Sequence, residues 1–412
     1  MPALVIRAPL VTVASLPPMS AQERPAGWPA IGIVASTFAV AMAATTVITP
    51  LYPGYVAEFG LSSLQVTIVF AAYGAAVMLG LALFGRLSDH YGRKPPLAAA
   101  LCVAIVAMAV FLLAQDLGAL LLGRVLIGLT AGVYTGTCTA WLVDLCPDRV
   151  RAAKIAIAAN LGGLGLGPLL GGVLAQWAPR PLRLVYAVEL VLLVVGLIAH
   201  RWMPETVARE RFDLDFRDLR PPPSVRPVFV PAAVAAIAAF GVSGVLGAVG
   251  PAMLRSVFDV GDPLAAGALL WASFTCAVIG QLLARRYDPS AALAAGCAGL
   301  ALSVCLLALA LEAEVLIALV AAAVLSGIST GVIIGAGLGL LTSIAPPEHR
   351  GLVASSYFLA AYIGLVVPVV GFGLVERSIG LVDTGLVFSA AIGVAVIGSG
   401  IAVWRPVRSP VT

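Results

Sequence analysis

The chain has 412 residues, of which 61% are hydrophobic and only 11% are charged, and its formal net charge is +4. An ordinary soluble domain has roughly 25% charged residues, so this composition excludes a water-soluble fold and indicates an integral membrane protein. A crossing takes about 20 apolar residues, so twelve crossings leave no room for a soluble enzyme domain. The basic residues are dispersed between apolar runs, which argues against a nucleic-acid partner.

The segment 1–28 contains a short apolar stretch that Pro17 and Pro18 interrupt. No convincing small-residue cleavage site follows it, so we expect a cytoplasmic N-terminal tail rather than a signal peptide. Met1 and Met19 both remain candidate translation starts, because the segment before Met19 carries no pattern that the later helices need.

Twelve apolar runs follow, each of a length that suits a membrane crossing. They lie at 29–51, 63–84, 96–115, 117–142, 152–177, 182–202, 228–250, 262–284, 290–311, 315–343, 351–373 and 381–404. The sequence predicts an all-α integral membrane fold with twelve transmembrane helices in two pseudo-symmetric six-helix bundles. We expect the bundles at 29–203 and 228–404, a central cytoplasmic loop at 204–227, and a cytoplasmic tail at 405–412.

Lysine and arginine are distributed unevenly over alternate loops. With the N-terminus inside, 19 of the 24 basic residues fall on the cytoplasmic side. The outer side receives only Arg180, Arg183, Arg255 and Arg377. The positive-inside rule therefore predicts a multi-pass protein of the cell inner (plasma) membrane with both termini in the cytoplasm.

The two halves also share a pattern. Pro147, Asp148, Pro168 and Gly171 recur 200 positions later as Pro347, Glu348, Pro368 and Gly371. Repeated helical bundles are how secondary transporters build a substrate site near the bilayer midplane.

The loop between the second and third runs reads Gly85-Arg-Leu-Ser-Asp89-His-Tyr-Gly92-Arg93-Lys94. Its glycines permit a sharp reversal, and its basic pair holds the loop in the cytoplasm. The loop resembles the major facilitator superfamily signature G-x-L-x-D-x-x-G-R-K. The resemblance implies two rocking bundles around a central cavity, with Asp89 latching the halves on the cytoplasmic side. A loop that only sets topology is the alternative.

The fifth run contains Gly163-Leu-Gly-Leu-Gly167-Pro168-Leu-Leu-Gly171-Gly172. This resembles the pattern G-x-x-x-G-P-x-x-G-G of the superfamily's antiporter branches, which include drug:proton exporters. Gly163, Gly167 and Gly171 recur every four residues and form a flat stripe, while Pro168 bends the helix. A static helix contact is the alternative, although a proline inside the stripe favours a moving interface.

Two charged residues are expected inside the apolar layer, each about 10 Å below the outer surface. Arg124, followed by Gly128, partly resembles the superfamily signature R-x-x-Q-G, with Ile127 in place of the glutamine. Glu189 is the single acid that the sequence places in this layer. Their equal depth suggests a salt bridge or a water-linked pair, although Arg124 could also extend to the outer headgroups. Glu189 is predicted either to carry the coupling proton or to serve as a structural partner of Arg124.

The other polar residues of the runs are neutral, which favours lipophilic or neutral substrates. Each hydroxyl could instead bond its own helix backbone. The predicted substrate cavity residues are Thr45, Thr49, Tyr134, Thr137, Trp141, Trp271, Ser329, Tyr357 and Tyr362.

The six cysteines form no cluster with one another or with the histidines, so no metal site and no cofactor are expected. The sequence predicts a monomeric secondary transporter and not an enzyme. The favoured function is proton-coupled efflux of a drug or a small lipophilic or neutral metabolite. The alternative is a symporter or uniporter that takes up a neutral nutrient such as a sugar. These patterns identify neither the substrate nor the direction of transport.

Overall fold

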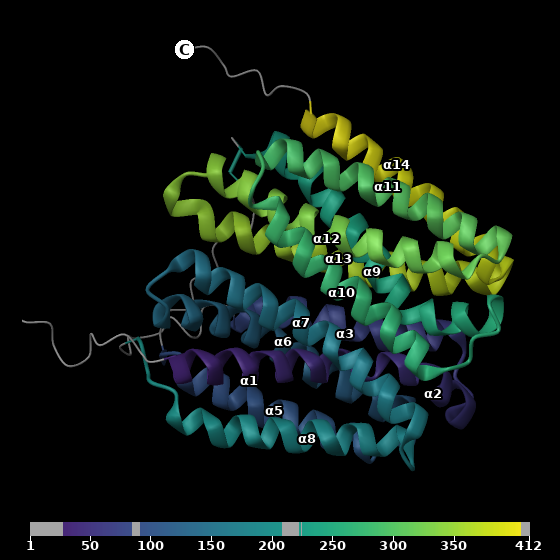
Figure 1. Ribbon diagram of the computed structural model, residues 1–412, viewed down its shortest axis with the longest axis horizontal. Coiled ribbons are helices and arrows are strands. Elements are labelled where there is room, and N and C mark those ends of the chain that lie inside the picture. The colour runs from purple at the N-terminus through teal and green to yellow at the C-terminus, as the bar shows by residue number, and fades with distance from the viewer. Residues whose placement is uncertain (1–27, 85–90, 208–221, 224, 405–412) are drawn as a thin grey trace, which may run out of the picture.

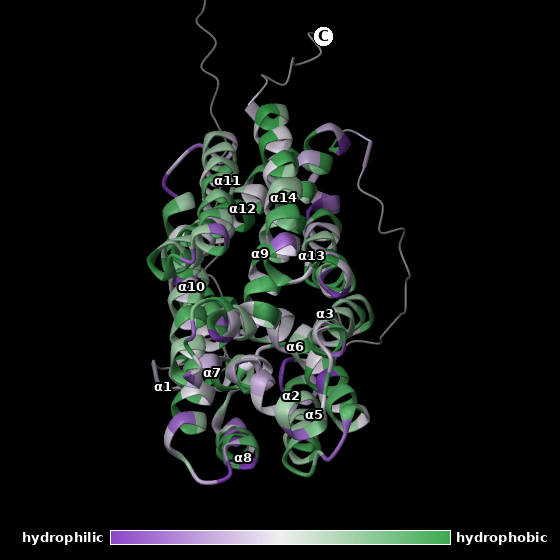
Figure 2. Ribbon diagram, turned by 90° about the vertical axis from the view of Figure 1, so that its right-hand side faces the viewer, coloured by the Kyte–Doolittle hydropathy of each residue, from purple (hydrophilic) through white to green (hydrophobic). Residues whose placement is uncertain are grey.

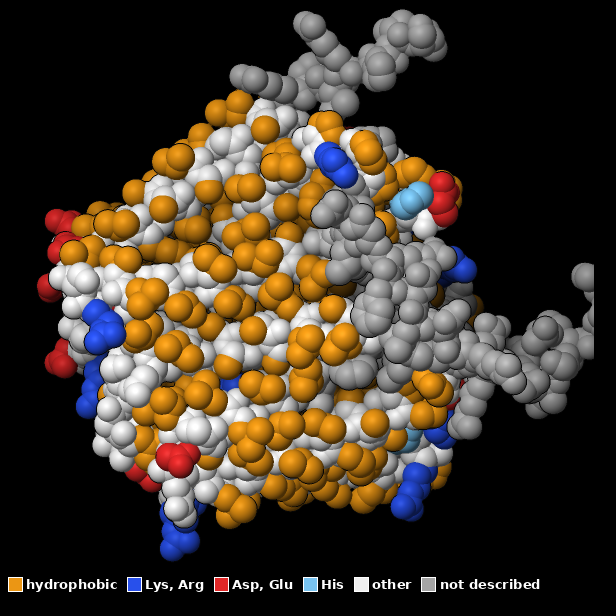
Figure 3. All heavy atoms as spheres, turned by 180° about the vertical axis from the view of Figure 1, so that it is seen from behind, with side chains coloured by type: hydrophobic (Ala, Val, Ile, Leu, Met, Phe, Trp, Pro, Cys, Tyr) orange, Lys and Arg blue, Asp and Glu red, His pale blue; other side chains and the backbone are white. Residues whose placement is uncertain are grey.

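The computed structural model describes residues 28–84, 91–207, 222–223 and 225–404. Within these ranges the chain is helical without any strand, and 12 segments are long and apolar enough to cross a membrane. The predicted all-α fold with twelve spans is therefore confirmed. Figure 3 shows apolar side chains over the middle of one face, with charged side chains mostly at its left and right edges.

The first six spans form one bundle, drawn from purple to teal in the lower half of Figure 1. The first span is α1 (Trp28–Thr46), which η2 (Thr49–Leu51) and α2 (Tyr52–Phe59) continue. The others are α3 (Ser63–Phe84), α5 (Lys94–Leu112), α6 (Leu117–Leu145), α7 (Arg149–Trp177) and α8 (Pro181–Ala199), which η3 (His200–Trp202) extends.

The last six spans form the second bundle, drawn from green to yellow in the upper half of Figure 1. They are α9 (Arg226–Val257), α10 (Pro263–Ala284), α11 (Pro289–Ala313), α12 (Leu316–Ile344), α13 (Arg350–Ile379), which η4 (Pro347–His349) precedes, and α14 (Leu381–Trp404). Figure 2 shows hydrophobic residues along the helices of both bundles.

Several helices begin at an acidic cap. The side chain of Asp148 accepts hydrogen bonds from the N–H groups of Val150 at 2.8 Å and Arg151 at 3.3 Å. Asp116 and Asp288 cap α6 and α11 in the same way. A cap satisfies N–H groups that the first turn leaves without partners, so these acids set where the helices start.

Several helix boundaries differ from the apolar runs, and two of them show why. The first run breaks after Thr46, because Pro50 and Pro53 lack the N–H groups that a continuous helix needs. In contrast, α13 continues to Ile379, six residues past the end of its run. Polar end turns stay helical outside the hydrocarbon, so helices exceed their apolar stretches.

The two bundles meet along two helix pairs. The most extensive contacts between them run between α7 and α10 and between α3 and α13. These pairs form the walls of the space in which the candidate site lies.

Candidate functional site

A polar cluster ties the start of α5 to the end of α6. Arg93 Nε donates to Asp144 Oδ2 at 2.9 Å and forms an ion pair with it. Thr206 Oγ1 donates to the same carboxylate oxygen at 3.0 Å. These contacts hold three separate segments of the first bundle together on the predicted cytoplasmic side.

Glu205 completes this cluster, and it was not among the predicted site residues. Its carboxylate accepts the N–H groups of Arg93 at 2.8 Å and Lys94 at 2.9 Å, as well as those of Thr206 at 3.0 Å and Val207 at 3.3 Å. Burial raises the pKa of Glu205, but these backbone N–H groups outweigh burial and hold the pKa below its usual value. One sequence feature could have identified Glu205: it is an acidic residue directly after the last apolar turn of the sixth span.

Gly92 lies where no other residue fits. Its φ is +86°, and a Cβ there would come within 2.7 Å of the Glu205 carboxylate. Gly85 and Asp89 lie outside the described residues, so the predicted latch at Asp89 stays a prediction.

The glycine stripe of α7 faces α1, within the same bundle. A Cβ on any of the three glycines would overlap a carbonyl oxygen of α1 or of Val47, the residue that follows α1. The overlapping pairs are Gly163 with Ala39, Gly167 with Ala43, and Gly171 with Val47. Thr46 Oγ1 also donates to the carbonyl oxygen of Leu164 at 2.8 Å. The stripe therefore joins α7 to α1 in close backbone contact.

A different face of α7 meets the second bundle. A Cβ on Gly172 would lie 2.7 Å from the carbonyl oxygen of Pro263, and one on Gly267 would overlap that of Pro168. The contact between the halves is thus made by Pro168 and Gly172 of α7 with the start of α10. It lies next to the glycine stripe and does not include it.

A central cavity of about 100 Å³ lies between the bundles. Residues from α1, α3, α6 and α7 line one side, and residues from α9, α10, α12 and α13 line the other. Among its described lining residues Arg124 alone is charged. The neutral polar residues that line it are Thr46, Thr49, Tyr73, Ser243, Ser273, Thr330 and Tyr362.

Thr49 and Tyr362 were predicted to line a substrate cavity, and they line this one. The other predicted residues do not line this cavity in this conformation, and their contact with substrate stays a prediction. Trp141 Nε1 donates to the Pro204 carbonyl at 3.0 Å, and Tyr357 OH donates to the Ile333 carbonyl at 2.9 Å. Trp271 is 40% exposed, and Thr45, Tyr134, Thr137 and Ser329 are buried outside the cavity lining.

Ser273 and Thr330 are cavity residues that the prediction missed. Both belong to helices that are apolar on every side, so the sequence does not indicate which side faces inward. The rotation of each helix about its axis decides which of its side chains line the central cavity.

Arg124 is 1% exposed and is bound to backbone carbonyl oxygens. Its Nη1 donates to Thr45 at 2.7 Å, its Nε to Val69 at 3.2 Å, and its Nη2 to Phe70 at 3.5 Å. The guanidinium also lies over the rings of Tyr73 and Phe70, at 4.6 and 5.4 Å from their centroids. Arg124 therefore stays inside the protein and does not extend to the headgroups.

Glu189 is fully buried, and neither of its carboxylate oxygens has a hydrogen-bond partner among the described residues. The suggested direct salt bridge with Arg124 is absent from this conformation. Equal depth along two helices does not place side chains together, because α8 packs mainly against α5 and α1. The side chains of Arg124 and Glu189 are thus buried apart from each other.

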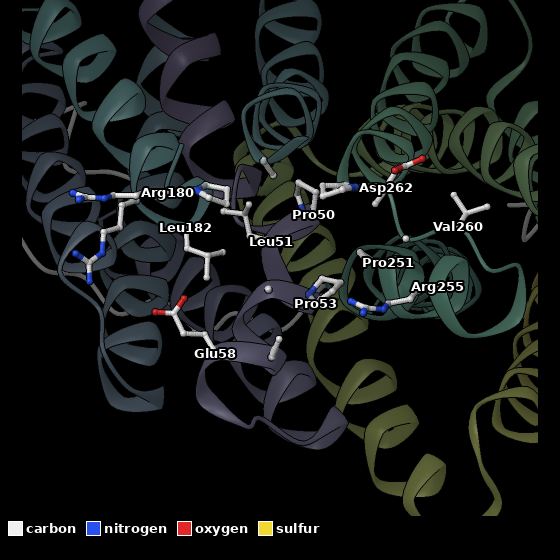
Figure 4. A pocket seen from close by; sticks show the side chains of 18 residues that line it. Pro50, Leu51, Pro53, Glu58, Arg180, Leu182, Pro251, Arg255, Val260 and Asp262 are labelled. Atoms are coloured by element: carbon white, nitrogen blue, oxygen red, sulfur yellow. The ribbon is translucent and has the colours of Figure 1, made fainter. Parts of the chain in front are cut away.

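A second, larger cavity of about 670 Å³ opens at the predicted outer side, and we call it the outer vestibule. Both bundles line it, through η2 and α2, the ends of α7 and α9, and the starts of α8 and α10. Figure 4 shows Arg255 of α9 extending toward Pro53 of α2, across the space between the halves. Its charged lining residues are Glu58, Arg180, Arg183, Arg255 and Asp262.

Two similar proteins are named for drug resistance. A class H tetracycline resistance protein of Pasteurella multocida is 30% identical over 169 residues, which is 40% of this chain and 41% of that protein. The quinolone resistance protein NorA of Staphylococcus aureus is 24% identical over 154 residues, 37% of this chain and 40% of that protein. Each match thus spans about two-fifths of the relative's own length.

Solved transporter structures share the fold over almost the whole chain. A bacterial homologue of the human lysosomal transporter Spinster, in an inward-facing and occupied conformation, gives a TM-score of 0.70 at 16% identity. That match covers 90% of this chain and 95% of the other. The nucleoside transporter NupG gives a TM-score of 0.71 at 12% identity, covering 92% and 100%.

The family match decides the class of the protein. Residues 34–369 match the family model of the Major Facilitator Superfamily. The match covers most of the chain and agrees with the twelve-span fold. The chain belongs to the Major Facilitator Superfamily.

Proposed function

We propose that the protein is a proton-coupled exporter of a drug or a small lipophilic metabolite, and that Glu189 exchanges the coupling proton. The observation that carries this proposal is the placement of Glu189. It is fully buried, and both of its carboxylate oxygens lack a partner among the described residues.

A carboxylate without a counter-charge or a donor is costly in a membrane interior. Burying such a charge costs at least about 2.5 kcal/mol even on scales that give low penalties. We therefore propose that Glu189 holds a proton in this conformation. It releases the proton when the helices around it move and admit water, which is the property that a coupling residue needs.

The helices around Glu189 supply a mechanical link to the central cavity. The helix that carries it, α8, packs against α5 and α1. The same α1 places Thr46, and the η2 turn that follows it places Thr49, in the cavity lining. A movement of α1 that opens the cavity therefore also changes the surroundings of Glu189, so substrate binding and proton binding influence each other.

The direction of transport is proposed from resemblance. The glycine and proline pattern of α7 resembles antiporter branches of the superfamily, and two similar proteins are named for resistance to tetracycline and to quinolone. Resistance by a transporter requires removal of the drug from the cell, so these similarities support efflux.

We further propose that the protein acts as a monomer in the plasma membrane with both termini in the cytoplasm. The uneven distribution of basic residues supports this orientation. The substrate cavity lies between the two halves of one chain, so a single chain supplies a complete site.

The test measures proton release in everted vesicles under an imposed pH gradient, with a panel of lipophilic compounds. We expect wild-type vesicles to accumulate substrate and to release protons when substrate is added. Glu189→Gln should abolish both, while downhill substrate exchange continues. The matched control is Glu312→Gln, which changes an exposed acid at the end of α11. Unchanged proton release from Glu189→Gln would exclude this residue as the proton carrier.

A further inference from the structure

We propose that the transported substrate carries a single oxyanion group, such as a carboxylate, which pairs with Arg124 in the central cavity. The substrate then leaves past the arginines of the outer vestibule. This inference rests on the proposed transport function and names its substrate class, an amphiphilic organic monoanion. Four observations carry it.

The charge of Arg124 has no counter-charge in the described part of the chain. Its three hydrogen bonds go to the carbonyl oxygens of Thr45, Val69 and Phe70, which are neutral acceptors. The described carboxylates form no ion pair with it, and Glu189 has no hydrogen-bond partner among the described residues. A full positive charge is therefore retained in a nearly dry site, where an incoming anion interacts with it most strongly.

Arg124 also keeps donors for a ligand. A guanidinium has five N–H groups, and three of them are used in the hydrogen bonds above. The remaining two belong to a residue that lines the cavity. A planar guanidinium matches an oxyanion better than any other cationic side chain.

The rest of the cavity suits an apolar body. Phe70, Phe240 and Phe274 line it together with hydroxyl groups such as those of Ser273 and Thr330, and no described acidic residue does. The present volume of about 100 Å³ admits an acid group and few further atoms, because drug-sized ligands occupy about 300 Å³ or more. Both bundles line the cavity, so movement of the halves enlarges it.

The outer vestibule extends the positively charged route from Arg124 toward the outer side of the membrane. Of the four arginines on the predicted outer side, Arg180, Arg183 and Arg255 line this one cavity. None of the three forms an ion pair with a described acid, and of the two lining acids Asp262 already accepts from Gln176 Nε2 at 3.3 Å. A cavity with an excess of positive charge and apolar walls attracts anions.

These observations argue against a cationic substrate and against a neutral one. A cation would be repelled by Arg124 in a site of low polarity, with no lining carboxylate to compensate. A neutral substrate would leave the guanidinium without a counter-charge while removing water from around it. An anion supplies the missing charge and uses the free donors.

The first experiment compares three probes with the same aromatic body in the purified full-length protein. The probes are naphthaleneacetate, naphthaleneacetamide and naphthylethylammonium, and their affinities are measured by thermal stabilisation in lipid nanodiscs. We expect the carboxylate to bind about tenfold tighter than the amide or more, and the ammonium to bind weakest. Equal affinity for carboxylate and amide, or tighter amide binding, would overturn the proposal. This comparison needs no variant, so a folding defect cannot obscure it.

The second experiment uses variants and transport of the same probes. Arg124→Gln should abolish the preference for the carboxylate, while Arg124→Lys should keep part of it, because the charge stays and the planar fork is lost. Arg255→Gln should slow efflux of the carboxylate severalfold and leave efflux of the amide unchanged. The control is Arg377→Gln, which changes the outer arginine that does not line the vestibule.

The outcomes separate this inference from the proposed function. Proton release that is driven equally by the amide and the carboxylate overturns the anion site and supports proton-coupled transport. A clear carboxylate preference without proton release supports the anion site and overturns proton coupling.

Discussion

Glu205 accepts four backbone N–H bonds, whereas Glu189, only 16 residues earlier, accepts none. Glu189 lies within α8, whereas Glu205 follows the cytoplasmic end of the same span, and the surroundings of the two glutamates differ. Donors around Glu205 favour its charged form, which makes it a fixed connector. The dry site around Glu189 disfavours charge, which suits a group that gains and loses a proton.

Glu205→Gln is expected to loosen the start of α5. An amide offers one acceptor oxygen where the carboxylate offers two, and its NH₂ group would face backbone donors. Because the site is partly solvated, we expect a loss of about 1 kcal/mol, with membrane insertion intact and transport reduced. Thermal unfolding and substrate efflux from the same preparation measure the two effects. Wild-type values for both would contradict the role of Glu205.

The same residue predicts a pH dependence. Its folded-state pKa lies below the ordinary value of 4.5, so its stabilising contribution is complete above that value and is lost as pH falls through the folded pKa. Wild-type protein should therefore lose stability on acidification below about pH 4.5, and Glu205→Gln should lose less. Melting temperatures between pH 3.5 and 7 check this, and parallel pH curves for the two proteins would disprove it.

At the scale of elements, α7 connects the two halves of the mechanism. One face, with Gly163, Gly167 and Gly171, is in backbone contact with α1, and another face passes Pro168 to reach α10. The sequence alone left open whether the glycine stripe is static or moving. Its placement inside one bundle favours the static role, and the contact from Pro168 to Gly267 provides the interface between bundles.

Gly167→Ala tests the contact between α7 and α1. The new methyl group would overlap the Ala43 carbonyl oxygen and lie 2.5 Å from Thr46 Oγ1, so the helices must separate. We expect a loss of about 1 to 3 kcal/mol of stability. The control is Gly162→Ala in the same helix, where a Cβ meets nothing within 4 Å, and it should leave stability unchanged or slightly higher. Equal melting temperatures for the two variants would show that the glycine stripe tolerates separation of α7 from α1.

At the scale of the whole molecule, the charges are arranged by face. The Arg93 and Asp144 cluster lies on the predicted cytoplasmic side, the outer vestibule lies on the opposite side, and Arg124 lies in the central cavity between them. The contacts of α7 with α10 and of α3 with α13 fix how these three sites lie relative to one another in this conformation. The proposed transport requires that the two bundles move relative to each other.

The orientation of the molecule is tested at the two ends of α11. Tyr287 precedes this helix on the predicted cytoplasmic side, and Glu312 lies near its outer end; both are exposed. In a variant without native cysteines, a membrane-impermeant maleimide added to intact cells should label Glu312→Cys and not Tyr287→Cys. Everted vesicles should show the reverse. Labelling of Tyr287→Cys in intact cells would invert the proposed topology.

The sequence by itself determined the class of fold, the twelve spans and the family. Each of these depends on local properties: apolar length, which a bilayer requires, and short motifs that need no knowledge of neighbours. It also located the two buried charges, Arg124 and Glu189, because charged residues are conspicuous within apolar runs.

Only the tertiary structure decided which side chains meet. A helix that is apolar on every side does not reveal its rotation, so Tyr357 turned away from the cavity while Ser273 turned toward it. Arg124 and Glu189 share a depth but face different neighbours, so each is buried without the other. Arg180, Arg183 and Arg255, which come from different bundles, line one vestibule because packing brings the bundles' outer ends together.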